Sequence, residues 1–213
     1  MGRMEQQKKD GRKCKVKICG LSRREDIALV NEEWPDYIGF VFWEKSKRRV
    51  TKEKAEELKY LLAPSIQAVG VFVDEDREVI LDLLANDIID IAQLHGSETE
   101  ADIRWLKEKS GKQIIRMVRL TESTDYRKLD DTVADYLLFD SGKGSGKTFD
   151  WSLMESVKRY CHKPFFLAGG ISADNAEEAI RQVQPYAIDL SSSLETEGVK
   201  DGEKIKALMA AIQ

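Results

Sequence analysis

Lys17-Ile18-Cys19-Gly20 closes the first apolar run of the chain and has the order expected of a strand that enters a tight turn. Val16 and Ile18 alternate with the lysine and with Cys19, so a strand here turns its apolar residues to one face and its lysine and thiol to the other. Ser22, a residue type that caps helices, follows the glycine closely. The stretch therefore predicts a strand and then a helix capped by Ser22, with Cys19 at the strand's C-terminal end.

The same order of strand, turn and helix repeats along the chain. Eight such units without a linker predict one closed parallel barrel with helices outside, a single α/β domain of the (β/α)8 or TIM-barrel class. An open doubly wound sheet is the alternative, although no dinucleotide fingerprint follows the first strand. The helix expected over Thr121–Asp131 has the weakest pattern. The strands predicted after the first are Tyr37–Phe42, Ile66–Val73, Ile88–Leu94, Gln113–Val118, Tyr136–Phe139, Phe165–Ala168 and Ala187–Leu190.

Composition narrows the class of protein. The 34 basic and 38 acidic residues give a net charge of -4, which lacks the basic footprint of a nucleic-acid-binding protein. No apolar run approaches the roughly 18 residues that a membrane span requires. Three distant cysteines without a secretory leader or metal-ligand spacing favour reduced thiols and a cytoplasmic location. We expect residues 1–13 to be disordered or vector-derived and residues 14–213 to form the barrel.

In a parallel barrel the C-terminal ends of the strands meet at one mouth, which is where this fold keeps its chemistry. A dense set of polar or small residues follows the predicted strands. It comprises Cys19, Gln93, His95, Arg116, Asp140, Gly169, Gly170, Asp189, Ser191 and Ser192.

Two neighbouring strand ends suit a phosphate group. Gly169-Gly170 precedes a helix expected near Ala173, and Ser191-Ser192 ends the last strand. Exposed backbone N–H groups and hydroxyls from these two connections can bind a dianion.

Two further loops are candidates for binding elements. Ser141–Thr148 is rich in glycine, but a nucleotide-binding Walker loop needs glycine where Ser141 stands, and the following helix is delayed. We interpret it as a mobile loop over the barrel mouth or a plain exposed connection. Lys45–Arg49 follows the second strand, where an arginine can bind a carboxylate through two hydrogen bonds.

Taken together, these motifs resemble the phosphoribosylanthranilate isomerase family of tryptophan biosynthesis, in order from about residue 15 to the C-terminus. Each motif alone is weak evidence for the family, whereas the eight motifs in this order along the chain are specific to it. They are Lys17–Gly20, Gly39–Phe42 with Ser46–Arg48, Val69–Val73, Gln93–Gly96, Leu138–Ser141, Gly146–Trp151, Leu167–Gly170 and Asp189–Ser192.

The resemblance implies a cofactor-free Amadori rearrangement of N-(5-phosphoribosyl)anthranilate, an aminoaldose, to 1-(2-carboxyphenylamino)-1-deoxyribulose 5-phosphate. By that resemblance Asp140 is the general acid for the ribose ring oxygen and Cys19 the base for the C2 proton. Arg48 binds the anthranilate carboxylate. The phosphate is held by Gly169, Gly170, Ser191 and Ser192, and His95 and Asp189 complete the expected substrate-binding set. No metal, nucleic acid or membrane is expected as a partner, and the chain is expected to be a monomer or homodimer.

The mechanism needs a protonated carboxyl at Asp140 and a thiolate at Cys19, the reverse of their ordinary states at neutral pH. Lys17 lies one step deeper on the face of Cys19, where it either favours the thiolate or pairs with Asp189 on the eighth strand.

The chain departs from the family pattern at three positions. Lys47 replaces a proline, Ser145 a threonine and Ser193 a glycine. A side chain at Ser193 is expected to strain its turn and to loosen the phosphate site.

Three rival functions remain at this stage. Histidine-pathway aminoaldose isomerases use two aspartates, which Cys19 argues against. An indole-forming synthase requires a lysine and glutamate set at the strand ends, which is missing. A phosphate-binding barrel without catalysis would have no need of both Cys19 and Asp140.

Overall fold

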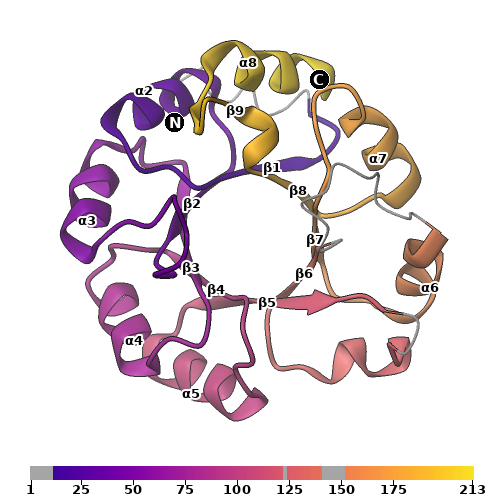
Figure 1. Cartoon of the computed structure of the whole chain (residues 1–213). Coiled ribbons are helices and arrows are strands. Elements are labelled where there is room, and N and C mark those ends of the chain that lie inside the picture. Colours follow the sequence, from indigo (N-terminus) through magenta and orange to yellow (C-terminus); the bar gives the residue numbers. More distant parts are fainter. Residues whose placement is uncertain (1–11, 122–123, 141–151) are drawn as a thin grey trace.

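The structure, a computed structural model, describes residues 12–121, 124–140 and 152–213. Eight parallel strands follow one another around a closed barrel, and β8 pairs with β1 (Figure 1). Closure confirms the predicted barrel and excludes the open sheet. The strands are β1 (Lys15–Cys19), β2 (Tyr37–Val41), β3 (Gln67–Phe72), β4 (Ile91–Leu94), β5 (Gln113–Arg119), β6 (Tyr136–Asp140), β7 (Phe165–Ala168) and β8 (Ala187–Leu190).

Helices form a ring outside the strands (Figure 1). A 3-10 helix, η2 (Ser192–Leu194), and a small hairpin of β9 (Glu195–Thr196) and β10 (Val199–Lys200) follow β8. The helices are α2 (Arg24–Glu33), α3 (Lys52–Leu61), α4 (Arg77–Ala85), α5 (Glu100–Ser110), α6 (Ser152–Tyr160), α7 (Ala176–Val183) and α8 (Gly202–Ala211).

The α-helix expected over Thr121–Asp131 was wrong. In its place stands a 3-10 helix, η1 (Tyr126–Asp131), of which only Leu129 is buried. A segment with a single buried apolar residue lacks the repeated apolar face that holds an α-helix against a barrel.

The starts of the helices follow local capping chemistry. Thr51 accepts a hydrogen bond from the backbone of Lys54 and caps α3. Ser22, however, is not the cap of α2: the N-cap is Arg23, and the carboxylate of Asp26 accepts the backbone N–H groups of both Ser22 and Arg23. Asp26, in the first turn of the helix, thus binds the backbone of the two residues that precede the helix.

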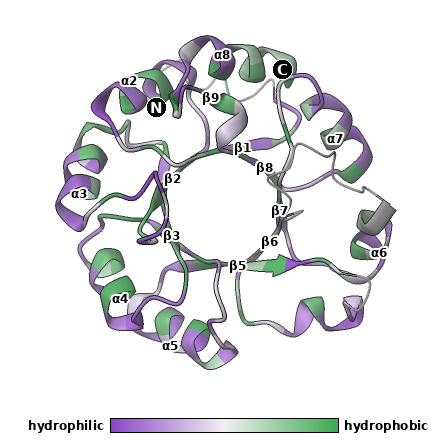
Figure 2. Ribbon diagram, viewed as in Figure 1, coloured by the Kyte–Doolittle hydropathy of each residue, from purple (hydrophilic) through white to green (hydrophobic). Residues whose placement is uncertain are grey.

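Two layers of apolar side chains hold the barrel together. The larger lies between the strands and the helices and contains Val16 and Ile18. The smaller fills the barrel interior, where Phe166 packs edge-on against Tyr37 and Tyr136. Figure 2 shows that the outer helices carry both hydrophilic and hydrophobic stretches, as expected for amphipathic helices. The alternation in β1 therefore sends its apolar residues outward to the helices and Cys19 inward, as predicted.

Two expectations fall on residues that the structure leaves undescribed. Of the segment 1–13, only residues 12 and 13 are described, and the loop Ser141–Thr148 lies entirely outside the described residues. Within the described part of the chain, every helix is too short or too polar to cross a bilayer.

Candidate active site

A cavity of about 530 Å³ opens at the C-terminal mouth of the barrel. This volume lies within the range of small-molecule sites. Of the nine predicted site residues, only Arg48 is absent from its walls. The lining residues are Cys19, Val71, Gln93, His95, Asp140, Ala168, Gly169, Gly170, Ile171, Ser172, Asp189, Leu190, Ser191, Ser192 and Ser193.

The thiol of Cys19 has room because its neighbour on β2 is a glycine. Cys19 and Gly39 are paired in register across β1 and β2. A Cβ atom on Gly39 would lie 2.6 Å from the Cys19 sulfur, closer than such atoms approach in real proteins. Gly39 therefore makes the space that the thiol occupies.

Lys17 forms a buried ion pair directly below Cys19. Its side chain is 0% exposed, and its Nζ lies 2.8 Å from Asp189 Oδ2 across β1 and β8. The same ammonium also interacts with Cys19. Burial raises the pKa of the Cys19 thiol, while the positive charges of Lys17 and Lys200 act to lower it. Lys17 thus pairs with Asp189, and its charge also acts to lower the pKa of Cys19.

On the opposite side of the mouth, Asp140 ends β6 next to a histidine. His95 Nε2 lies 3.9 Å from Asp140 Oδ2, and His95 Nδ1 lies 3.2 Å from the amide nitrogen of Gln93. Burial lowers the pKa of His95, and the charge of Asp140 only partly offsets this. A neutral imidazole that accepts at Nδ1 carries its hydrogen on Nε2, the atom facing Asp140.

The residues predicted to bind phosphate line the cavity together, but the connection after β7 differs from expectation. Gly169 and Gly170 both have positive φ, 86° and 70°, a conformation that glycine adopts freely. The following helix does not begin near Ala173, because α7 starts only at Ala176. A turn in which Asn175 accepts the backbone N–H of Ser172 and donates to Gly170 O takes up the space between. The turn, rather than the helix terminus, therefore borders the cavity.

The second half of the wall follows β8. The Ser191 hydroxyl donates to the carbonyl oxygen of Cys19, which ties this connection to β1. Ser192 and Ser193 lie in η2, and Ser193 is not among the residues with positive φ. The expectation that a side chain at Ser193 strains its turn was therefore wrong, since the backbone there suits any residue.

Arg48 is engaged by a carboxylate of the protein itself. Its Nε and Nη2 donate to the two oxygens of Glu195, each at 2.6 Å. Lys200, whose side chain is 1% exposed, donates to the same carboxylate and to Ser191 O. The arginine runs past Gly20, where a Cβ would lie 2.4 Å from Arg48 Cδ. Glu195 and Lys200 were not identified as functional residues from the sequence. A glycine turn between these two oppositely charged residues was the available signal of a hairpin.

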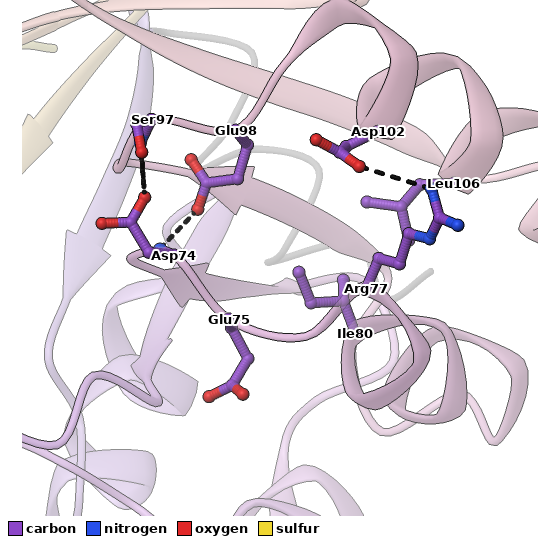
Figure 3. A pocket seen from close by; sticks show the side chains of 8 residues that line it. All are labelled: Asp74, Glu75, Arg77, Ile80, Ser97, Glu98, Asp102 and Leu106. Atoms are coloured by element: carbon purple, nitrogen blue, oxygen red, sulfur yellow. Dashed lines mark hydrogen bonds and ion pairs between the residues drawn. The ribbon is translucent and has the colours of Figure 1, made fainter.

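A second cavity, of about 230 Å³, lies beside the mouth between the connections after β3 and β4 (Figure 3). Its acidic groups are paired internally: Asp74 Oδ1 accepts both the hydroxyl and the backbone N–H of Ser97, and Glu98 accepts the backbone N–H of Asp74. Figure 3 shows these side chains turned toward one another, with Arg77 paired to Asp102. We interpret this cluster as a brace between two loops. In the described parts of the chain, no group of three or more His, Cys, Asp or Glu side chains is arranged to hold a metal ion.

Comparisons with known proteins agree with this geometry. The sequence model of the family described as N-(5'phosphoribosyl)anthranilate (PRA) isomerase matches residues 16–211. The N-(5'-phosphoribosyl)anthranilate isomerase of Endomicrobium trichonymphae is 44% identical over 196 residues, which cover 90% of this chain and 94% of the relative. That of Clostridium acetobutylicum is 41% identical, over 93% of this chain and 98% of the relative.

Solved structures give the same answer. The phosphoribosyl anthranilate isomerase of Thermotoga maritima superposes with a TM-score of 0.83 at 36% identity, over 93% of this chain and 98% of that one. A phosphoribosyl anthranilate isomerase in complex with reduced 1-(o-carboxyphenylamino)-1-deoxyribulose 5-phosphate superposes with a TM-score of 0.81 at 34% identity, over the same fractions. These similarities remove the rival functions, and the chain belongs to the N-(5'-phosphoribosyl)anthranilate isomerase family.

Proposed function

We propose that the 530 Å³ cavity carries out the family's isomerisation with Cys19 as the base and Asp140 as the acid. The observation that carries this proposal is that both groups line one cavity, from β1 and β6, together with the phosphate wall of Gly169–Gly170 and Ser191–Ser192. The overall activity is that of a phosphoribosylanthranilate isomerase of tryptophan biosynthesis. Our proposal assigns each proton transfer of that reaction to a residue.

The rearrangement begins with two proton transfers at different atoms. The Asp140 carboxyl gives its proton to the ribose ring oxygen, the C1–O bond breaks, and the nitrogen lone pair forms an iminium ion. The Cys19 thiolate then removes the proton from C2, and the C–H electron pair neutralises the iminium as an enolamine. The enolamine becomes the ketone when C1 gains a proton and the C2 hydroxyl loses its proton to solvent. One acid and one base on different strands can supply these transfers.

The remaining predicted residues position the substrate in this proposal. The glycine turn after β7 and the serines after β8 bind the phosphate through backbone N–H groups and hydroxyls. Arg48 offers the substrate carboxylate its Nη1 edge, because Nε and Nη2 are held by Glu195. His95 presents its Nε2 hydrogen beside Asp140, and Asp189 lies in the cavity wall.

Two substitutions test the acid and base roles. Cys19→Ser replaces a thiol by a far weaker acid and base, and Asp140→Asn removes the transferable proton while keeping the side-chain shape. Each should lower kcat/KM by about 10²-fold or more, the usual reach of one general acid or base. The measurement is the fluorescence decay of freshly made phosphoribosylanthranilate. Both variants should still bind inorganic phosphate. A Cys19→Ser enzyme with near-normal kcat would mean that the thiol only packs, and His95 would become the next candidate base.

We also propose a cytoplasmic enzyme that acts as a monomer or homodimer. Reduced cysteines and a substrate from amino-acid biosynthesis support the location. A related Thermotoga maritima phosphoribosylanthranilate isomerase is described as dimeric. Light scattering after gel filtration distinguishes the two states, and a larger assembly would contradict the proposal.

A further inference from the structure

Two buried oxygen atoms, on residues that line the cavity, have no hydrogen-bond partner among the described residues. One is Oε1 of Gln93, a residue that is 2% exposed, and the other is Oδ1 of Asp189, whose side chain is 8% exposed. Both residues line the 530 Å³ cavity. Because an unpaired buried acceptor is costly, each of these oxygens is a place where a hydrogen-bond donor belongs.

The second polar atom at the end of each side chain is held by a neighbouring residue. The Gln93 amide nitrogen lies 3.2 Å from His95 Nδ1, and Asp189 Oδ2 receives the Lys17 ammonium at 2.8 Å. Each group is thereby oriented, and its second oxygen is buried without a donor from the described protein residues.

The chemistry of these oxygens restricts what they bind. A carboxylate oxygen and an amide oxygen accept hydrogen bonds and donate none, so they favour hydroxyl groups and disfavour a phosphate or carboxylate. The phosphate wall lies elsewhere in the same cavity. Among the parts of a phosphoribosyl aryl amine, the sugar hydroxyls are the donors that fit.

We propose that Asp189 Oδ1 and Gln93 Oε1 accept hydrogen bonds from the two free ribosyl hydroxyls, on C2 and C3 respectively, and so make the site specific for a hydroxylated sugar. This proposal rests on the proposed roles of Cys19 and Asp140.

The positions of the two acceptors give the assignment. Asp189 is paired in register with Lys17, two residues before Cys19 on β1, so it lies beside the group that removes the C2 proton. Gln93 lies on β4 next to His95, which faces Asp140. Because Asp140 serves the ring oxygen on C4, the sugar carbon between the two reacting ends is C3, and its hydroxyl meets Gln93.

The test compares two substrates in two matched variants. Anthranilate condenses with ribose 5-phosphate to the natural substrate and with 3-deoxyribose 5-phosphate to an analogue that lacks the C3 hydroxyl. Gln93→Met keeps the length of the side chain and removes its polar atoms. Gln113→Met is the control, since it makes the same change in the neighbouring strand β5, where the amide bonds the Tyr136 hydroxyl rather than lining the cavity.

With the natural substrate, Gln93→Met should lose at least tenfold in kcat/KM, while Gln113→Met loses less than threefold. The kcat/KM of the wild-type enzyme should be at least tenfold lower for the 3-deoxy analogue than for the natural substrate. The kcat/KM of Gln93→Met for the analogue should equal that of the wild-type enzyme for the analogue. Gln93→Glu retains an acceptor, so it should still discriminate between the substrates, which keeps the test usable if the methionine variant is unstable.

An equal loss on both substrates in Gln93→Met would overturn the proposal, because the glutamine would then act only through His95 or through packing. Unchanged kinetics on the natural substrate would also overturn it. Failure of the acid and base roles shows separately, as activity that survives in Cys19→Ser. The two-substrate comparison gives its answer whichever group is the base.

Discussion

At the scale of single residues, the site depends on how the thiol of Cys19 is surrounded. Gly39 leaves it space, and the ammonium of Lys17 lies beneath it. Burial alone would keep the thiol protonated, since a low-dielectric environment disfavours the charged form. The cations nearby oppose that effect, although burial remains the larger influence on the pKa of Cys19. The pKa of the proposed base is therefore set by residues that need not touch the substrate.

The pH profile tests this tuning. Lys17 lowers the pKa of Cys19, so Lys17→Met should raise that pKa and move the rising limb of kcat/KM to higher pH. The rate at neutral pH should fall as a result. Lys15→Met is the matched control, because Lys15 lies on the same strand and bonds the hydroxyl of Tyr186. A rising limb that stays in place in Lys17→Met would show that the lysine serves only Asp189.

A second test at the scale of residues concerns the ion pair between Arg48 and Glu195. Glu195 holds this guanidinium through two hydrogen bonds, and its own pKa is lowered by Arg48 and Lys200 despite burial. Glu195→Gln should free the arginine and raise KM by roughly three- to tenfold with kcat nearly unchanged, because oriented binding of the carboxylate is lost. Glu197→Gln, in the turn of the same hairpin, should leave KM unaltered. A lower KM in Glu195→Gln would mean that Glu195 competes with the substrate.

At the scale of elements, the proposed phosphate wall consists of two short connections rather than of a long helix. Gly169–Gly170 turns with positive φ before α7, and η2 follows β8 directly. Backbone N–H groups at such turns form concave anion sites without a complete helix dipole. The wall therefore depends on local backbone shape at two adjacent strand ends.

Competitive inhibition by inorganic phosphate tests this wall. Ser193→Gly should change the inhibition constant by less than about twofold, because Ser193 is free of left-handed strain and glycine relieves nothing there. Gly170→Ala should weaken inhibition by about tenfold or more, since φ of 70° is costly for alanine. Markedly tighter phosphate binding by Ser193→Gly would restore the idea of a strained turn.

At the scale of the whole molecule, buried thiols link stability to pH. Burial raises the pKa of Cys14 to about 12 and that of Cys161 to about 11, from 9.0. A group whose pKa is raised on folding contributes stability that is complete below pH 9 and is lost as the pH climbs toward 11 and 12.

The free energy of unfolding in urea should therefore decline between about pH 9 and pH 11. The Cys14→Ala/Cys161→Ala variant should be less stable at pH 8 because of its small cavities, yet it should show a flatter decline. Parallel pH curves for the two proteins would mean that these thiols do not set the alkaline limit.

The sequence by itself determined the barrel and the direction of its key side chains. Alternation in β1 placed Val16 and Ile18 against the helices and Cys19 inside, because successive side chains in a strand point to opposite faces. The repeats of strand and helix favoured a closed barrel over an open sheet, and the pairing of β8 with β1 then excluded the open sheet. Since strand ends share one mouth, the sequence also brought Cys19 and Asp140 to one cavity.

Only the tertiary structure decided which polar groups meet. Glu195 binds Arg48, 147 positions away in the chain, and also Lys200, five positions away. No local pattern encodes the longer pairing. The same is true of the space that Gly39 leaves for Cys19 and of the unpaired oxygens of Gln93 and Asp189. Periodicity fixes the face on which a side chain lies. A hydrogen bond, in contrast, is sensitive to differences of a few tenths of an ångström in the donor–acceptor distance, and these distances are set when the strands close into a barrel.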